Sequence, residues 1–173
     1  MIRRYPDEPA GEFPTPPRRI TDREGREIQL RHADGTDRTA LIEMYKQFDP
    51  ADRAQGIPPA REPAIEDWLD TILGEDTLNV AAVHEGSVVG HATLVPDRHG
   101  EHELAIFVLQ TFQGAGIGTN LVETLLGLAQ SEGLGKVWLT VERWNDPAVT
   151  LYRKVGFETT DAESFEIEMS IRL

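Results

Sequence analysis

The sequence predicts an α/β fold built on a mixed, mostly antiparallel sheet of six to seven strands, with helices on both faces. Three observations support this fold class. Seven segments carry apolar residues at strand spacing, and four carry them at helical spacing. Their order is a strand, two helices, three strands, a helix, a strand, a helix and two strands, which is neither regular strand–helix alternation nor an all-strand pattern. A glycine-rich turn joins the fourth strand directly to the third helix.

The composition indicates a globular domain that depends on no cysteine chemistry. The chain has 173 residues, of which 39% are hydrophobic and 27% charged, and it contains no cysteine. Disulfides, thiolate metal sites and a cysteine nucleophile are therefore excluded. No apolar stretch is long enough to span a membrane, and the N-terminus lacks the apolar core of a secretion signal. We therefore expect a cytoplasmic protein that does not bind membranes.

The charge balance is strongly acidic. There are 30 acidic and 17 basic residues, which give a net charge of -13. Such a surface repels the phosphate backbone of DNA or RNA, so we expect no nucleic-acid partner.

The first half of the chain predicts an arm, a strand and two helices. Residues 1–24 contain five prolines among charged residues and show no period, so we expect an extended arm, disordered or laid on the surface, before one domain over 25–173. The elements that follow are a strand at 26–32, a helix from a cap at Asp34 or Thr36 to about Phe48, a loop over 49–59 and a helix from Pro63 to about Leu73.

The second half predicts an antiparallel meander and then two more helices. Two strand-like runs at 77–84 and 87–95 flank Glu85-Gly86, which is typical of a tight hairpin turn. The remaining elements are a strand from Glu101, a helix ending near Ser131, a strand at 136–141, a helix at 145–155 and a final antiparallel pair at 157–161 and 164–173.

The glycine-rich turn between Gln113 and Gly118 predicts an anion site. The first amides of a helix have no partner within the helix, and the helix dipole adds partial positive charge there. Glycines allow the backbone to approach a phosphate closely. The turn contains no lysine or arginine. We therefore expect backbone amides and the dipole, not charged side chains, to bind the anion.

Two motifs resemble those of the GCN5-related N-acetyltransferase (GNAT) superfamily. The run ELAIFVLQTFQGAGIG is similar to the acyl-CoA loop of that family, Q/R-x-x-G-x-G/A, with Gln113, Gly116 and Gly118 at the matching positions. The segment from Asn145 to Phe157 resembles the family pattern N-x-x-A-x-x-L-Y-x-K-x-G-F. One helix and one strand separate the two motifs, as in the family, and the resemblance covers about residues 26–173.

The resemblance implies a cosubstrate and a set of residues that bind it. It implies a GNAT-type sheet in which central strands 4 and 5 splay apart, with acetyl-CoA as cosubstrate in the gap. The histidines show no metal-ligand spacing, so we expect no metal. The cofactor-binding residues it implies are Ile106, Phe107, Val108, Gln113, Gly114, Ala115, Gly116, Ile117, Gly118, Asn145 and Tyr152.

Two residues are candidates for proton transfer. The resemblance places Tyr152 as the general acid that protonates the leaving thiolate; the alternative is a tyrosine that only packs its ring on the sheet. It places Glu103 as the base that takes the amine proton, directly or through water; the alternative is a carboxylate in solvent. Nearby alternatives for the base are Glu101, His102 and His91. Asn145 is either a cofactor contact or a simple helix cap.

The resemblance implies an N-acetyltransferase in which a primary amine attacks the thioester directly, with both substrates bound. The acceptor is a small amine or a protein lysine or N-terminus, and a non-catalytic acyl-CoA sensor is the rival function. In the family, the first two helices and the last hairpin select the acceptor, here about 45–68 and 158–165. The acidic residues Asp49, Asp52, Glu62, Glu66 and Asp67 would suit a cation, or are general surface charge. The strand 165–173 could form a homodimer.

Overall fold

The computed structural model describes residues 3–49, 58–162 and 165–173, and it holds one eight-stranded sheet. The strand order is β1-β2-β3-β4-β5-β6-β8-β7, and every pair of neighbours is antiparallel except β5 and β6. The strands are β1 (Arg18–Thr21), β2 (Glu27–His32), β3 (Leu78–His84), β4 (Ser87–Pro96), β5 (His102–Val108), β6 (Lys136–Glu142), β7 (Glu158–Ala162) and β8 (Glu166–Arg172). The α-helices are α1 (Arg38–Tyr45), α2 (Glu62–Ile72), α3 (Ile117–Ser131) and α4 (Asp146–Val155).

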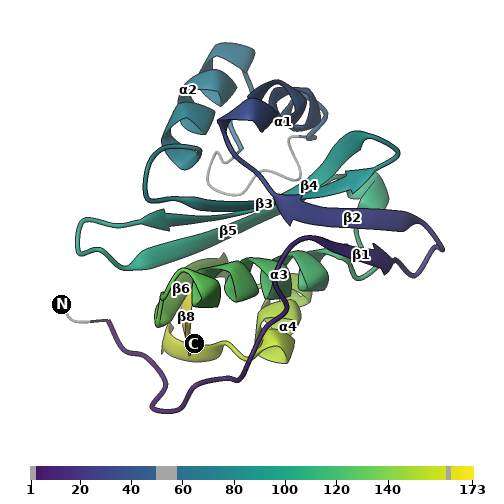
Figure 1. Cartoon of the computed structure of the whole chain (residues 1–173). Coiled ribbons are helices and arrows are strands. Elements are labelled where there is room, and N and C mark those ends of the chain that lie inside the picture. The colour runs from purple at the N-terminus through teal and green to yellow at the C-terminus, as the bar shows by residue number, and fades with distance from the viewer. Residues whose placement is uncertain (1–2, 50–57, 163–164) are drawn as a thin grey trace.

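Helices cover both faces of the sheet, as the sequence predicted. Figure 1 shows α1 and α2 on one face and α3 and α4 on the other. The apolar face of α3, which includes Leu121 and Leu125, is fully buried in the core. Before α1, the Asp34 side chain accepts a hydrogen bond from the Thr36 amide and caps a short 3-10 turn, so Asp34, not Thr36, is the cap.

The central strands separate after a short stretch of pairing. β5 and β6 are parallel and pair only at His102 with Val137 and Glu103 with Trp138. Beyond these pairs, β5 continues along β4 to Val108, and β6 continues along β8 to Glu142. The facing edges of β5 and β6 therefore open into a gap, which confirms the predicted splay.

The sheet has one strand more than the sequence predicted, because part of the N-terminal segment joins it. Ile20 on β1 lies opposite Ile28 on β2, and the two strands form a hairpin that turns at Gly25. Four residues next to a proline-rich stretch are too few to show a strand period, which is why β1 was missed.

Residues before β1 run in an extended path over α3 and β8 (Figure 1). The Ala10 amide donates to the Arg172 carbonyl, and the Phe13 amide donates to the Gln130 side chain, both at 2.9 Å. At Gly127 on α3, an added Cβ would lie 1.9 Å from the Pro14 carbonyl oxygen. The close contact of this segment with α3 therefore needs a glycine at position 127.

The last strand lies inside the sheet, and a homodimer formed through 165–173 stays a prediction. β8 pairs with β6 on one side and β7 on the other, so both of its edges are used. The sequence predicted the hairpin of the last two strands correctly but not its insertion beside β6, because strand order does not follow from a local pattern.

A chain of buried hydrogen bonds fixes α1 and the end of α2 against the sheet. The Tyr45 hydroxyl lies 2.5 Å from Nδ1 of His91, and Nε2 of His91 lies 2.7 Å from Oδ1 of Asn79. The Asn79 amide nitrogen donates to the Ile72 carbonyl, so its oxygen is left to accept from His91. His91 is thus neutral and protonated at Nε2, and its Nδ1 accepts a hydrogen bond from the Tyr45 hydroxyl.

This buried histidine predicts a specific loss of stability in mild acid. Burial lowers the pKa of His91 from 6.5 to about 3. Because the unfolded chain binds this proton and the folded chain does not, stability falls as the pH drops from about 6.5 toward 3, by up to about 1.4 kcal/mol per pH unit. Urea unfolding at pH 7, 6 and 5 should show this slope in the wild type.

In His91→Gln, the slope of the unfolding free energy against pH should be smaller by the contribution of about one proton. The matched control is His99→Gln, which changes an exposed turn and should keep the wild-type slope. An unchanged slope in His91→Gln would contradict the assignment.

Candidate active site

A groove of about 870 Å³ lies in the gap between β5 and β6. This volume is in the range of pockets that hold cofactors. Its walls come from β5, β6, the glycine turn and α4, so segments far apart in sequence meet there. The predicted site residues that line it are Glu103, Ile106, Phe107, Val108, Gln113, Gly114, Gly116, Gly118, Asn145 and Tyr152. Ala115 and Ile117 were also predicted, but their side chains are buried and do not line the groove.

The glycine turn bends the chain sharply into α3. Gly116 is the residue before the helix and has a φ of +90°, in the left-handed region that favours glycine. The Gln113 side chain donates to the Val108 carbonyl at 2.9 Å, so it also ties the turn to the end of β5. The turn therefore presents the first amides of a 15-residue helix at one end of the groove.

Tyr152 and Asn145 reach the groove from α4. The Tyr152 ring packs against Phe157 with centroids 5.7 Å apart, and burial raises the pKa of its hydroxyl, which stays protonated at neutral pH. Tyr152 also lines the groove, so it packs its ring in the core and can still contact a substrate there. Asn145 accepts from the Ala148 amide at 3.4 Å, which makes it the helix cap as well as a lining residue.

Glu103 lies where β5 and β6 begin to separate. Burial raises the pKa of its carboxyl, nearby Arg3 lowers it, and the carboxylates of Asp97, Glu166 and Glu168 raise it again. Arg3 is held beside these groups by ion pairs of 3.0 to 3.3 Å to Glu101, Glu168 and Asp97, and its guanidinium stacks 3.5 Å from the Trp138 ring. Glu103 is thus a half-buried carboxylate with a raised pKa, which is a suitable property for a base.

The alternatives to Glu103 are placed elsewhere. His91 is fully buried, and both of its ring nitrogens have partners. Glu101 pairs with Arg3. Neither of these two residues, nor His102, lines the groove.

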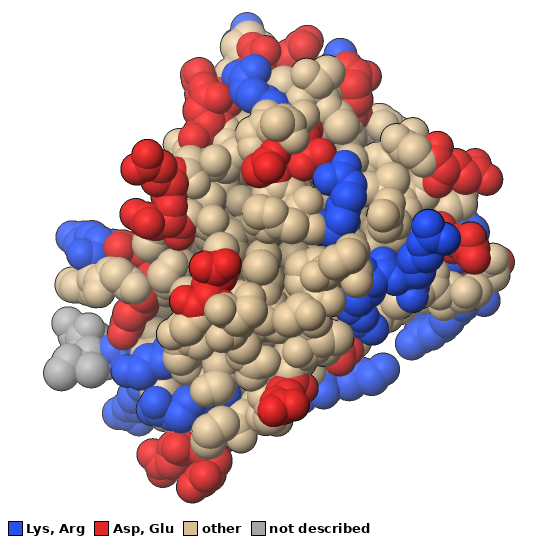
Figure 2. Space-filling view, viewed as in Figure 1, with Lys and Arg blue, Asp and Glu red and all other residues tan. Residues whose placement is uncertain are grey.

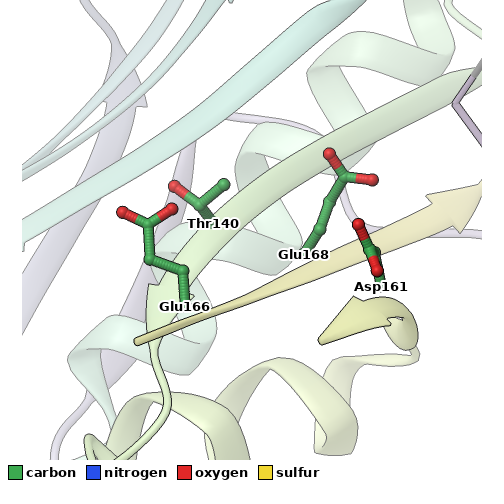
Figure 3. Close-up of a pocket in the computed structure, with 4 residues that line it drawn as sticks. All are labelled: Thr140, Asp161, Glu166 and Glu168. Atoms are coloured by element: carbon green, nitrogen blue, oxygen red, sulfur yellow. The ribbon is translucent and has the colours of Figure 1, made fainter. Parts of the chain in front are cut away.

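A small acidic pocket adjoins the groove. It has a volume of about 100 Å³ and is lined by Thr140, Asp161, Glu166 and Glu168. Figure 3 shows these four side chains, which come from three neighbouring strands. Glu168 on β8 lies opposite Thr140 on β6 and opposite Asp161 on β7, and Glu166 is two residues before it on β8. Thr140 lines both cavities, so these carboxylates lie beside the wall of the groove.

Two of the five acidic residues predicted near the acceptor form ion pairs with residues outside the groove. On α2, Glu62 lies 3.8 Å from Lys46, and Glu66 lies 3.9 Å from Arg38. Asp67 does not line the groove, and Asp52 lies outside the described residues. In the described segments, the carboxylates nearest the groove come from β5, β6 and β8.

Several residues of the groove were not indicated by the sequence. Arg23, between β1 and β2, lies at the glycine turn, and its Nη1 donates to the Gly114 carbonyl at 3.4 Å. A charged side chain from outside the glycine turn thus lies beside it, and the expectation that backbone amides and the helix dipole bind the anion stays a prediction. Figure 2 shows basic side chains gathered on the side of the molecule where β1 and β2 lie. The other unpredicted lining residues include Thr140, Glu142, Trp144 and Lys154.

Residues 3–49, 58–162 and 165–173 contain no group of three or more histidine, aspartate or glutamate side chains placed to hold a metal ion. Within the same ranges, every helix is too short or too polar to cross a bilayer.

Comparisons with known proteins agree with this geometry. The model of the acetyltransferase (GNAT) family matches residues 38–157. The mycothiol acetyltransferase of Saccharomonospora viridis is 36% identical over 143 residues, which are 75% of this chain and 45% of that protein. The chain thus spans about half the length of the curated relatives it matches.

Solved structures share the fold. The GNAT domain of S. lividans PAT has a TM-score of 0.80 at 16% identity, over 91% of this chain and 97% of that one. A GNAT superfamily phosphinothricin acetyltransferase from Sinorhizobium meliloti, in complex with acetyl-CoA, has a TM-score of 0.70 at 23% identity, over 89% of each chain. With the matched family model, the splayed strands and the glycine turn before α3, the chain belongs to the GNAT family of acetyltransferases.

Proposed function

We propose that this protein transfers the acetyl group of acetyl-CoA to a primary amine by direct attack, with both substrates bound in the groove. The observation that carries the proposal is that a single groove joins the glycine turn, the open edge of β5, Tyr152 and Glu103. A non-catalytic sensor would need the first two features but not the last two.

The residues of the groove fit acetyl-CoA. The unpaired edge of β5 offers backbone groups to the pantetheine arm of acetyl-CoA, which is an amide chain. The amides at the start of α3 suit the pyrophosphate of the same molecule. Bound acetyl-CoA supplies the thioester. The groove then has to place the amine nitrogen against the carbonyl carbon, and this positioning provides much of the rate enhancement.

The proton transfers can be assigned to two residues and solvent. Glu103 takes a proton from the ammonium group through water, which frees the nitrogen lone pair for attack, and the nitrogen loses its second proton to solvent once the carbon–nitrogen bond has formed. Tyr152 gives its proton to the sulfur as the carbon–sulfur bond breaks. Afterwards Glu103 loses its proton to solvent and Tyr152 regains one, so the products are the N-acetyl amine and free CoA.

The charge around Glu103 favours an acceptor that is cationic in solution. Glu103 and Glu142 line the groove itself, and Glu166 and Glu168 lie in the adjoining pocket. Carboxylates of this density attract an ammonium group, and Glu103 can deprotonate it at the site of attack. A small amine and a lysine side chain both meet this description.

Turnover tests the proposal. The purified protein is incubated with acetyl-CoA and a panel of polyamines, amino sugars, amino acid esters and lysine peptides, at low and high salt. We expect CoA release matched one to one by N-acetylated product with at least one cationic amine. Tight binding of acetyl-CoA with CoA release at background for the whole panel would leave the sensor function instead.

The pH dependence of the rate tests the role of Glu103. Because only the deprotonated carboxylate accepts a proton, kcat/KM should rise with pH through the raised pKa of Glu103. Arg3→Gln removes the cation that lowers the pKa of Glu103, so this pKa should rise further and the acid limb of the profile should move to higher pH. The measurement is kcat/KM for the amine against pH, with acetyl-CoA saturating.

The control is Arg19→Gln, which removes the same charge from an exposed position outside the groove. The assignment of Glu103 as the base would be contradicted if the acid limb of the kcat/KM profile stayed at the same pH in Arg3→Gln, or if it persisted in Glu103→Gln.

A further inference from the structure

The geometry points to Arg23 as the residue that binds a phosphate group of the nucleotide end of CoA. This inference rests on the proposed use of acetyl-CoA. It adds a cationic contact from outside the glycine turn, supplied by the hairpin of β1 and β2.

The contacts of Arg23 hold it at the turn. Its backbone amide donates to the Ala115 carbonyl at 3.0 Å, and its guanidinium donates to the Gly114 carbonyl. A Cβ added at Gly116 would lie 3.9 Å from Nε of Arg23. Arg23 therefore flanks the segment whose amides begin α3, and it lines the same groove.

The hairpin loop that carries Arg23 is itself well fixed. The Asp22 carboxylate is fully buried and accepts from the amides of Glu24 and Arg26 and from Nε of Arg26, at 2.7 to 3.0 Å. Arg26 in turn donates to the Thr111 carbonyl and stacks 4.2 Å from the Phe112 ring. Asp22 thus fixes the loop internally, and Arg26 anchors it to the segment that leads into the glycine turn.

The charge of Arg23 is available for a ligand. Over the described ranges, Arg3, Arg26, Arg31 and Arg38 each form an ion pair with a carboxylate, whereas Arg23 forms none. A guanidinium has five donors, and one contact to Gly114 leaves most of them unused. In a chain with a net charge of -13, an unpaired arginine beside a helix N-terminus attracts an anion.

The groove is therefore polarised along its length. Arg23 lies at the glycine turn, and Glu103 lies where β5 and β6 part. The first end suits the phosphates of CoA, and the second suits a cationic amine. Two phosphate groups of CoA, the pyrophosphate and the 3′-phosphate, share the chemistry that Arg23 recognises.

The test is calorimetric binding of acetyl-CoA, acetyl-dephospho-CoA and acetyl-pantetheine to the full chain and three variants. Arg23→Gln should weaken acetyl-CoA binding about tenfold, the usual scale for a charge-assisted hydrogen bond at a partly exposed site. Arg23→Lys should recover most of the affinity, and Arg19→Gln on the same hairpin should stay within about twofold. Acetyl-pantetheine, which has no phosphate, should bind Arg23→Gln and the wild type equally.

Acetyl-dephospho-CoA assigns the contact. A tenfold loss that persists with this ligand places Arg23 on the pyrophosphate, and a loss that vanishes places it on the 3′-phosphate. The inference is overturned if Arg23→Gln binds acetyl-CoA like Arg19→Gln, or if it weakens acetyl-pantetheine as much as acetyl-CoA. Since binding is measured without turnover, a wild type that binds acetyl-CoA but transfers nothing would refute the proposed function and leave Arg23 in place.

Discussion

Replacing Tyr152 with phenylalanine is expected to lower kcat about a hundredfold while the affinity for acetyl-CoA stays within about twofold, since general acid catalysis commonly contributes about 10²–10⁴-fold. The ring of Tyr152 packs against Phe157, and phenylalanine keeps that packing, so the fold should be unaffected. What is lost is the proton that the leaving sulfur needs. The measurements are steady-state CoA release with the best amine of the panel and calorimetric binding of acetyl-CoA.

Tyr5→Phe is the matched control, because it removes a tyrosine hydroxyl that does not line the groove. It should keep wild-type turnover. Full activity in Tyr152→Phe would remove this residue from the mechanism, and a loss of acetyl-CoA affinity equal to the loss of rate would make it a binding residue only.

Replacing Gly116 with valine is expected to abolish acetyl-CoA binding. The left-handed φ of +90° costs a β-branched residue about 1–2 kcal/mol, and the new side chain would project into the groove near Arg23. It would occupy the space in which the amides at the start of α3 meet a phosphate. We expect the dissociation constant to rise at least about a hundredfold, measured by calorimetry.

Backbone strain is separated from blockage of the groove by Gly133→Val. Gly133 follows α3, has a φ of +83°, and has no atom within 4 Å of an added Cβ. This variant should lose a similar amount of stability, measured by urea unfolding, yet bind acetyl-CoA normally. Normal binding in folded Gly116→Val would mean that the glycine turn is not the phosphate site.

The cofactor end of the site could be predicted because its residues are close together in sequence. The strand, the glycine turn and the helix from Glu101 to Ser131 are one continuous segment, and a helix N-terminus after glycines has a direct physical meaning. Asn145 and Tyr152 lie seven residues apart in a second continuous motif. The elements that line the cofactor end of the groove could therefore be predicted from local sequence.

The charged surroundings of the groove could not be predicted, because they depend on contacts distant in sequence. Arg23 reaches a carbonyl 91 positions later, and Arg3 reaches Glu168 over 165 positions. Both arginines belong to the proline-rich segment, whose sequence shows no period. The place of β8 between β6 and β7 could not be predicted for the same reason, because it is set by topology and not by the alternating pattern of the strand.

The central claim is that acetyl-CoA binds in the gap between β5 and β6. Its most direct test is amide hydrogen exchange, measured with and without acetyl-CoA. NMR should show slower exchange on binding for the amides of β5 that face the gap, within 106–108, and for those of 114–118. The amides between β6 and β8, which are already paired, should not change. The assignment of this groove as the active site would be contradicted if saturating acetyl-CoA slowed exchange at other amides but left it unchanged at 106–108 and 114–118.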